Sequence, residues 1–146
     1  MIDEKQVLLN VPASSQRDVI ERLVQKAFEL GKVTDVASVT EAVLKREQEG
    51  TTGFGKGIAI PHGKSAFVTE PSLFIAKTTS GLDWKAMDGQ PVSTLFLILV
   101  PEGSHTEHLQ ILAKLARKLM HDDFVETVTQ LNDEASLADF IRREIS

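Results

Sequence analysis

The sequence predicts a single-domain α/β fold, a three-layer α/β/α sandwich with a central mixed β-sheet. Apolar residues recur three and four positions apart before residue 50 and after residue 105, which is typical of helices that bury one face. Between these regions lie short β-branched and apolar runs, which are typical of strands. The run over residues 94–100 is uniformly apolar, so both faces of the sheet need a cover of helices.

Helices are expected at both ends of the chain. For the first one, Ser14 or Ser15 can cap the N-terminus and Gly31 can end the helix. Gly50 is the expected stop of the second helix. The expected helices run over residues 15–30 and 38–49, from residue 106 onward, and over residues 123–130 and 134–144.

Extended segments are expected between the two helical regions. A glycine-rich loop over residues 51–56 precedes them, and the glycine- and aspartate-containing turns over 81–84 and 87–89 separate two of them. An early segment over residues 7–11 adds an edge strand. The other expected strands run over residues 57–60, 72–79 and 94–100.

The composition excludes several classes of function. The 146 residues include 16 Lys and Arg against 21 Asp and Glu, and the net charge of −5 argues against non-specific nucleic-acid binding. Cysteine is absent, which excludes disulfides, thiolate metal sites and a cysteine nucleophile. The longest apolar run ends at Pro101, too short to cross a bilayer, and the polar first residues are no signal peptide. We therefore expect a cytoplasmic protein.

The most informative segment is Gly57-Ile-Ala-Ile-Pro-His-Gly63. Pro61 lacks the N–H that would continue a strand ladder, and Gly63 permits backbone angles that other residues avoid. We therefore expect the strand to stop at His62 and to leave its imidazole at an exposed rim.

The preceding glycine-rich segment, residues 50–57, matches a nucleotide-binding phosphate loop at all but its last position. The Ser or Thr that would bind magnesium is missing there. The order of elements is also reversed, because a helix leads in and a strand leads out. The segment is thus interpreted as a tight connection next to His62 and not as a nucleotide site.

The histidines suggest two kinds of chemistry. His105 and His108 lie three apart at the start of a helix and could bind a metal with His62, although no third helical ligand is evident. Alternatively, a neutral imidazole can accept and pass on a phosphoryl group. Such a site needs a cation for the phosphate oxygens and a donor near the developing charge, and on residue type Arg46 and His108 are the candidates.

Residues 47–63 resemble the phosphorylation-site signature of the fructose/mannitol-type IIA domains of the bacterial phosphoenolpyruvate-dependent sugar phosphotransferase system. The match consists of the acidic Glu47, six variable positions, Phe54-Gly55, two further positions and Ile-Ala-Ile-Pro-His-Gly. Downstream, the apolar run that ends at Pro101 and the Glu-His-Leu that begins at residue 107 are similar to the family's second shared block. The resemblance extends over nearly the whole chain, and it implies that residues 1–146 form one such type-2 EIIA domain.

This resemblance implies a phosphocarrier. His62 would accept a phosphoryl group on Nε2 from the phosphohistidine of HPr, and would donate it to a cysteine on the cytoplasmic IIB domain of a sugar permease. The family's phosphate-holding arginine lies sixteen residues before the histidine and its second histidine forty-six residues after, and these positions are Arg46 and His108 here. No cofactor is required.

Two other functions remain open from the sequence. Nitrogen-regulatory IIA proteins share this signature and act through phosphorylation-dependent binding of other proteins, although residues 83–92 look more like the fructose-transport members. The other alternative is a metal-dependent hydrolase that uses His62, His105 and His108, and it leaves the long match over residues 47–63 unexplained.

Overall fold

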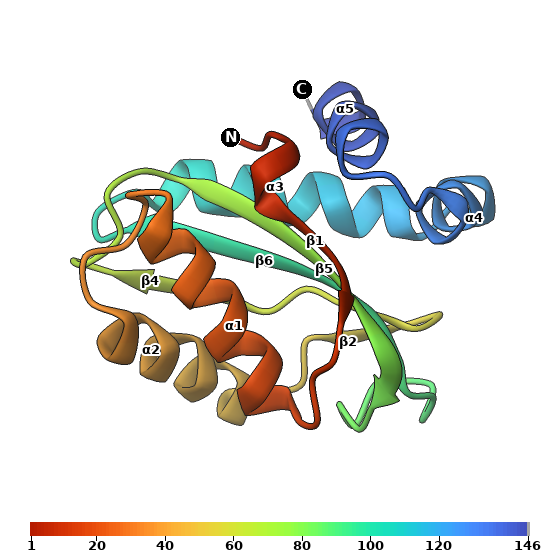
Figure 1. Cartoon of the computed structure of the whole chain (residues 1–146), viewed down its shortest axis with the longest axis horizontal. Helices are drawn as coiled ribbons and strands as arrows, with labels where there is room; N and C mark the ends of the chain where they lie inside the picture. The colour runs from red at the N-terminus through yellow and green to blue at the C-terminus, as the bar shows by residue number, and fades with distance from the viewer. Residues whose placement is uncertain (146) are drawn as a thin grey trace.

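The computed structural model describes residues 1–145, apart from the side chains of residues 105–109. In this part of the chain a mixed six-stranded sheet lies between two layers of helices, which confirms the predicted sandwich (Figure 1). The strands are β1 (Val7–Val11), β2 (Gly53–Gly55), β3 (Ile58–Ala59), β4 (His62–Ser65), β5 (Ser72–Leu82) and β6 (Val92–Pro101). The helices are the short 3-10 helix η1 (Glu4–Gln6), α1 (Gln16–Glu29), α2 (Val36–Glu49), α3 (His105–Leu119), α4 (Asp122–Gln130) and α5 (Glu134–Ile145).

The strand order is β1-β5-β6-β3-β2, and β4 also pairs with β6. Figure 1 shows α1 and α2 on one face of the sheet and α3, α4 and α5 on the other. Strand β6 serves both cores, because Leu97 and Leu99 belong to the cluster on the α1–α2 side while Phe96 and Ile98 belong to the cluster on the opposite side. This alternation explains the uniformly apolar run, since successive side chains of a strand point to opposite faces.

The caps account for the helix boundaries on the α1–α2 face. The side chain of Ser15 accepts a hydrogen bond from the amide of Asp18, as the sequence predicts for the start of α1. Helix α2 begins at Val36, two residues earlier than predicted, because the carboxylate of Asp35 accepts a hydrogen bond from the amide of Ser38. Among the described residues, no helix is long and apolar enough to cross a bilayer.

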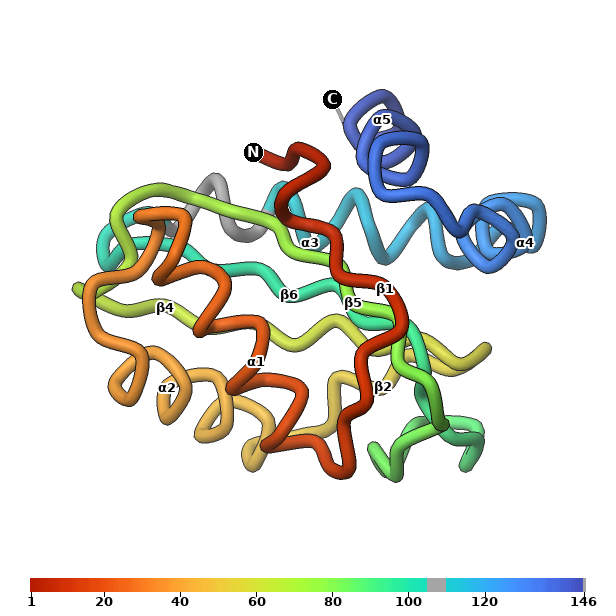
Figure 2. The backbone as a smooth tube through the Cα atoms, in the orientation of Figure 1, coloured from red at the N-terminus to blue at the C-terminus, as the bar shows by residue number. Residues whose placement is uncertain are grey.

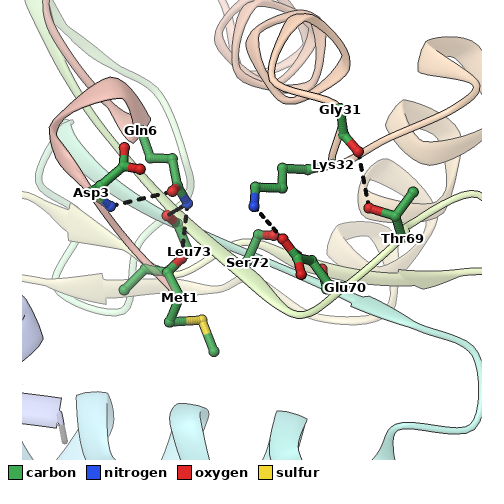
Figure 3. Close-up of polar contacts among 9 residues, drawn as sticks. All are labelled: Met1, Asp3, Gln6, Gly31, Lys32, Thr69, Glu70, Ser72 and Leu73. Carbon is green, nitrogen blue, oxygen red and sulfur yellow. Dashed lines mark hydrogen bonds and ion pairs between the residues drawn. The ribbon is translucent and has the colours of Figure 1, made fainter.

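Two sets of polar contacts hold the sheet edge and the end of α1 in place (Figure 3). The side-chain amide of Gln6 donates hydrogen bonds to the carbonyls of Met1 and Leu73, at 2.8 and 2.9 Å, and so fastens the start of the chain to β5. Just after α1, Lys32 forms an ion pair with Glu70 in the segment that leads into β5. The connection between β4 and β5 is thereby fixed to the α1 end.

The expected end of a strand at His62 is wrong, because the strand resumes there. Ile58 pairs with Thr94 in β3 and His62 pairs with Ile98 in β4, so both strands run parallel to β6 with the same offset of 36 residues. Only Ile60 and Pro61 interrupt the pairing, and even there the Pro61 carbonyl accepts a hydrogen bond from the Ile98 amide at 3.0 Å. Figure 2 shows β4 between β6 and α2. His62 therefore lies within the sheet and is 8% exposed, not at an exposed rim.

Helix α2 lies directly against β4 at Gly63. A Cβ atom on Gly63 would lie 2.7 Å from Cγ2 of Val43 and 3.2 Å from the Val43 backbone nitrogen. Since Val43 is fully buried, it has little room to move. The glycine after His62 thus allows α2, which carries Arg46, to approach the strand closely.

We expect Gly63→Ala to lower the free energy of unfolding by about 1–3 kcal/mol through overpacking against Val43. Urea denaturation followed by circular dichroism would measure this loss. The matched control is Gly50→Ala, because Gly50 has an extended backbone and open space around its Cα. Equal stability of the two variants would contradict the close approach of α2 to β4.

Candidate functional site

The His62 imidazole is oriented by a backbone carbonyl two residues earlier. Its Nδ1 lies 3.0 Å from the carbonyl oxygen of Ile60. A carbonyl oxygen can only accept a hydrogen bond, so Nδ1 must carry the proton and donate it. In the neutral ring the lone pair then lies on Nε2. This arrangement makes Nε2 the nucleophilic atom of His62.

The surroundings of His62 favour its neutral form. Desolvation by burial is the largest cause that lowers the pKa of His62 below its ordinary value of 6.5, and the positive charge of Arg46 lowers it further. The hydrogen bond to Ile60 and the negative charge of Glu47 raise the pKa and oppose this shift in part. Because the net direction is downward, the imidazole is mainly neutral at pH 7, as a nucleophile must be.

This shift predicts a pH dependence of stability. Below pH 6.5 the unfolded chain binds a proton at His62 more readily than the folded chain does, so the free energy of unfolding should fall. The loss should level off once the pH is below the pKa of folded His62. Urea denaturation from about pH 8 to about pH 5 would measure it, with His62→Gln as the reference that lacks the titrating group. An identical pH dependence in the variant would show that His62 is not its source.

Arg46 comes from the last turn of α2 and lies close enough for its charge to act on His62. Its guanidinium Nη1 donates a hydrogen bond to the Gly50 carbonyl at 3.0 Å, across the end of the helix. A guanidinium has five N–H groups in a planar fork, so this anchor leaves donors that can bind phosphate oxygens. The structure thus brings two of the three predicted site residues together.

The third predicted residue, His108, belongs to α3 by its backbone, but its side chain lies outside the described residues, as does that of His105. The pairing of His108 with His62 therefore stays a prediction. The same holds for the metal site of His62, His105 and His108. Among the side chains that the structure does describe, no three His, Asp or Glu residues gather as metal ligands.

The segment over residues 50–57 contains a strand that the sequence did not predict. Strand β2 (Gly53–Gly55) pairs antiparallel with β3. The segment lies between helix α2 and strand β3, so no helix begins after it. A phosphate loop places its glycines before a helix N-terminus, and this segment does not.

A buried polar cluster beside the site was also missed from the sequence. The carboxylate of Glu47 accepts hydrogen bonds from the amide and the hydroxyl of Thr52, and the indole Nε1 of Trp84 donates to that hydroxyl. All three residues are less than 9% exposed. The sequence feature that could have indicated this cluster is an acidic residue in the last turn of a helix, where the helix dipole disfavours negative charge.

Residues 1–144 match the family model described as phosphoenolpyruvate-dependent sugar phosphotransferase system, EIIA 2. The chain is 38% identical over 135 residues to the PTS system fructose-specific EIIA component of Haloferax volcanii, a match that covers 92% of this chain and 88% of the relative.

Two solved structures have a similar fold. The nitrogen regulatory protein IIA-Ntr from Neisseria meningitidis superposes with a TM-score of 0.85 and 31% identity, over 98% of this chain and 94% of that one. Enzyme IIA mannitol from Escherichia coli, solved in complex with phosphorylated enzyme IIB mannitol, superposes with a TM-score of 0.77 and 16% identity. That match covers 99% of this chain and 96% of the other.

Proposed function

Because this chain belongs to the EIIA type-2 family of the phosphoenolpyruvate-dependent sugar phosphotransferase system, we propose that it is a phosphocarrier that uses His62. In this proposal His62 accepts a phosphoryl group from the phosphohistidine of HPr and passes it to a cysteine of a IIB domain, for coupled sugar uptake and phosphorylation. The observation that carries the proposal is the hydrogen bond from Nδ1 to the Ile60 carbonyl, which leaves the nucleophilic lone pair on Nε2.

The transfer needs no proton to leave His62. The lone pair of Nε2 forms a bond to phosphorus while the bond from phosphorus to the donor imidazole breaks. When the other nitrogen of the donor ring carries a proton, the donor leaves as a neutral imidazole and the phosphorylated ring of His62 takes over its positive charge. The proton stays on Nδ1, which keeps its hydrogen bond to the Ile60 carbonyl. In the second step the bond from Nε2 to phosphorus breaks as a thiolate sulfur forms its bond. Arg46 supplies positive charge for the phosphate oxygens in both steps.

Sugar transport is the favoured output. The relative from Haloferax volcanii is a fructose-specific EIIA component, and the mannitol protein of similar fold was solved with its phosphorylated IIB partner. The second candidate is a regulatory role, which the 31% identity and the TM-score of 0.85 to a nitrogen regulatory protein favour. Both outputs would use the same phosphorylated histidine.

The test is stepwise phosphorylation of the purified chain. Incubation with phosphoenolpyruvate, the first enzyme of the pathway and HPr should give an acid-labile phosphate, and peptide mapping should place it on His62. Addition of a fructose-class IIB domain should then move the label to its cysteine. Labelling at His62 without transfer to any IIB domain would favour the regulatory role. Absence of labelling, while a known IIA domain is labelled in parallel, would overturn the proposal.

A further inference from the structure

We infer that Glu47 and Thr52 are positioning residues for His62, which act through the backbone N–H and carbonyl of Ile60. Neither residue has to touch the phosphoryl group. The inference rests on the proposed function, because it concerns how the same imidazole is held for transfer. Three consecutive sets of hydrogen bonds link the buried carboxylate of Glu47 to the imidazole, through Thr52 and Ile60.

The first contact joins the end of α2 to the segment that follows. The Glu47 carboxylate accepts a hydrogen bond from the Thr52 amide at 2.6 Å and another from the Thr52 hydroxyl at 2.5 Å. Burial of a carboxylate is costly, and the C-terminal end of a helix adds an unfavourable dipole. Helix propensity therefore does not explain an acid at this position, whereas its two hydrogen bonds to one residue do.

Trp84 fixes the direction of the Thr52 hydroxyl. The indole N–H can only donate, and it reaches the hydroxyl oxygen at 3.3 Å. The hydroxyl proton must then point away from Trp84 and toward the Glu47 carboxylate. A further bond, from the Thr51 hydroxyl to the Trp84 carbonyl at 2.9 Å, holds the same segments together. Thr52 is therefore held in one hydrogen-bonding arrangement.

The Thr52 carbonyl transmits this arrangement to the imidazole. It accepts a hydrogen bond from the Ile60 amide at 3.0 Å, while the Ile60 carbonyl accepts the bond from His62 Nδ1, also at 3.0 Å. Ile60 lies in the interruption between β3 and β4, where the pairing with β6 is missing. Thr52 thus holds the backbone of Ile60, the residue whose carbonyl sets the tautomer and orientation of His62.

Loss of the Thr52 hydroxyl should therefore loosen His62 without removing any group that meets the phosphate. Thr52→Val leaves the Trp84 N–H and one Glu47 oxygen without their partner, so residues 50–52 and the Ile60 carbonyl can shift. Small misplacements of a reacting group reduce rates strongly. We expect the rate of His62 labelling by phosphorylated HPr to fall roughly 10- to 100-fold.

The matched control is Thr40→Val. Thr40 lies in the same helix as Glu47 and is 3% exposed, and its hydroxyl has no hydrogen-bond partner among the described residues. This variant should keep the wild-type labelling rate, and Thr52→Ser, which keeps the hydroxyl, should stay within a few-fold of it. Nitrogen-15 chemical shifts of His62 in the unphosphorylated protein supply the second readout. They should report mainly the Nδ1–H tautomer in wild type and in both of these proteins, and a mixture in Thr52→Val.

Several outcomes would overturn the inference. One is a wild-type imidazole that is mainly protonated on Nε2, which needs no variant to detect. Others are an unchanged rate and tautomer in folded Thr52→Val, or an equal loss in Thr40→Val, which would indicate general packing. If circular dichroism shows that Thr52→Val is unfolded, Glu47→Gln decides by the tautomer alone, because the charge of Glu47 also acts directly on the pKa of His62. Failure of the proposed function is distinguishable, because wild type would then stay unlabelled while the tautomer still depended on Thr52.

Discussion

Replacement of His62 by alanine should abolish phosphoryl acceptance while the chain stays folded. The variant removes the nucleophilic Nε2 itself. Intact mass after incubation with phosphoenolpyruvate, the first enzyme and HPr should show no acid-labile phosphate. The fold should survive because the lost hydrogen bond to Ile60 is worth only about 1 kcal/mol.

His121→Ala is the matched control for this prediction. His121 is exposed, precedes the first residue of α4 and makes no side-chain capping bond there. The His121→Ala variant should be labelled at the wild-type rate, since the loss of one imidazole elsewhere leaves the site intact. Full labelling of His62→Ala on another histidine would contradict the assignment of His62.

Replacement of Arg46 by alanine should slow labelling about 100- to 1,000-fold, the usual cost of losing one preorganised charge donor. Its loss should also raise the pKa of His62, because the positive charge of Arg46 now lowers that pKa. The acid side of the rate profile should therefore move to higher pH. Single-turnover labelling by phosphorylated HPr across pH measures both effects.

Two variants separate the role of Arg46 from a general effect of charge. Lys45→Ala removes the same charge from the neighbouring, exposed position of α2 and should change the rate little. Arg46→Lys should recover only part of the rate, since an ammonium lacks the planar fork. If Lys45→Ala were as slow as Arg46→Ala, net charge and not a specific contact would explain the loss.

The architecture could be predicted because its signals are local and periodic. The alternating apolar side chains of β6 require cover on both faces, and the cap at Ser15 can be identified from a single residue type. The chemistry of Arg46 and His62 could likewise be selected by residue type, and the structure brings these two together. The position of the His108 side chain stays a prediction.

The rest depended on contacts between distant segments. Pro61 predicts a strand end, but the pairing with β6 continues after it. The Ile98 amide still donates a hydrogen bond to the Pro61 carbonyl. The role of Glu47 was hidden for the same reason. Its partner Thr52 is held by Trp84, thirty-two residues further along, and no local pattern predicts that pairing.

The interrupted strand also determines what a docking partner can detect. The backbone of His62 is held against β6 by the parallel pairing of β4. The addition of phosphate is therefore not expected to rearrange the backbone around His62. The difference between the two forms of the protein is then mainly a change in surface potential. A partner that distinguishes them should do so through its own positive charges, and its preference should weaken as ionic strength rises.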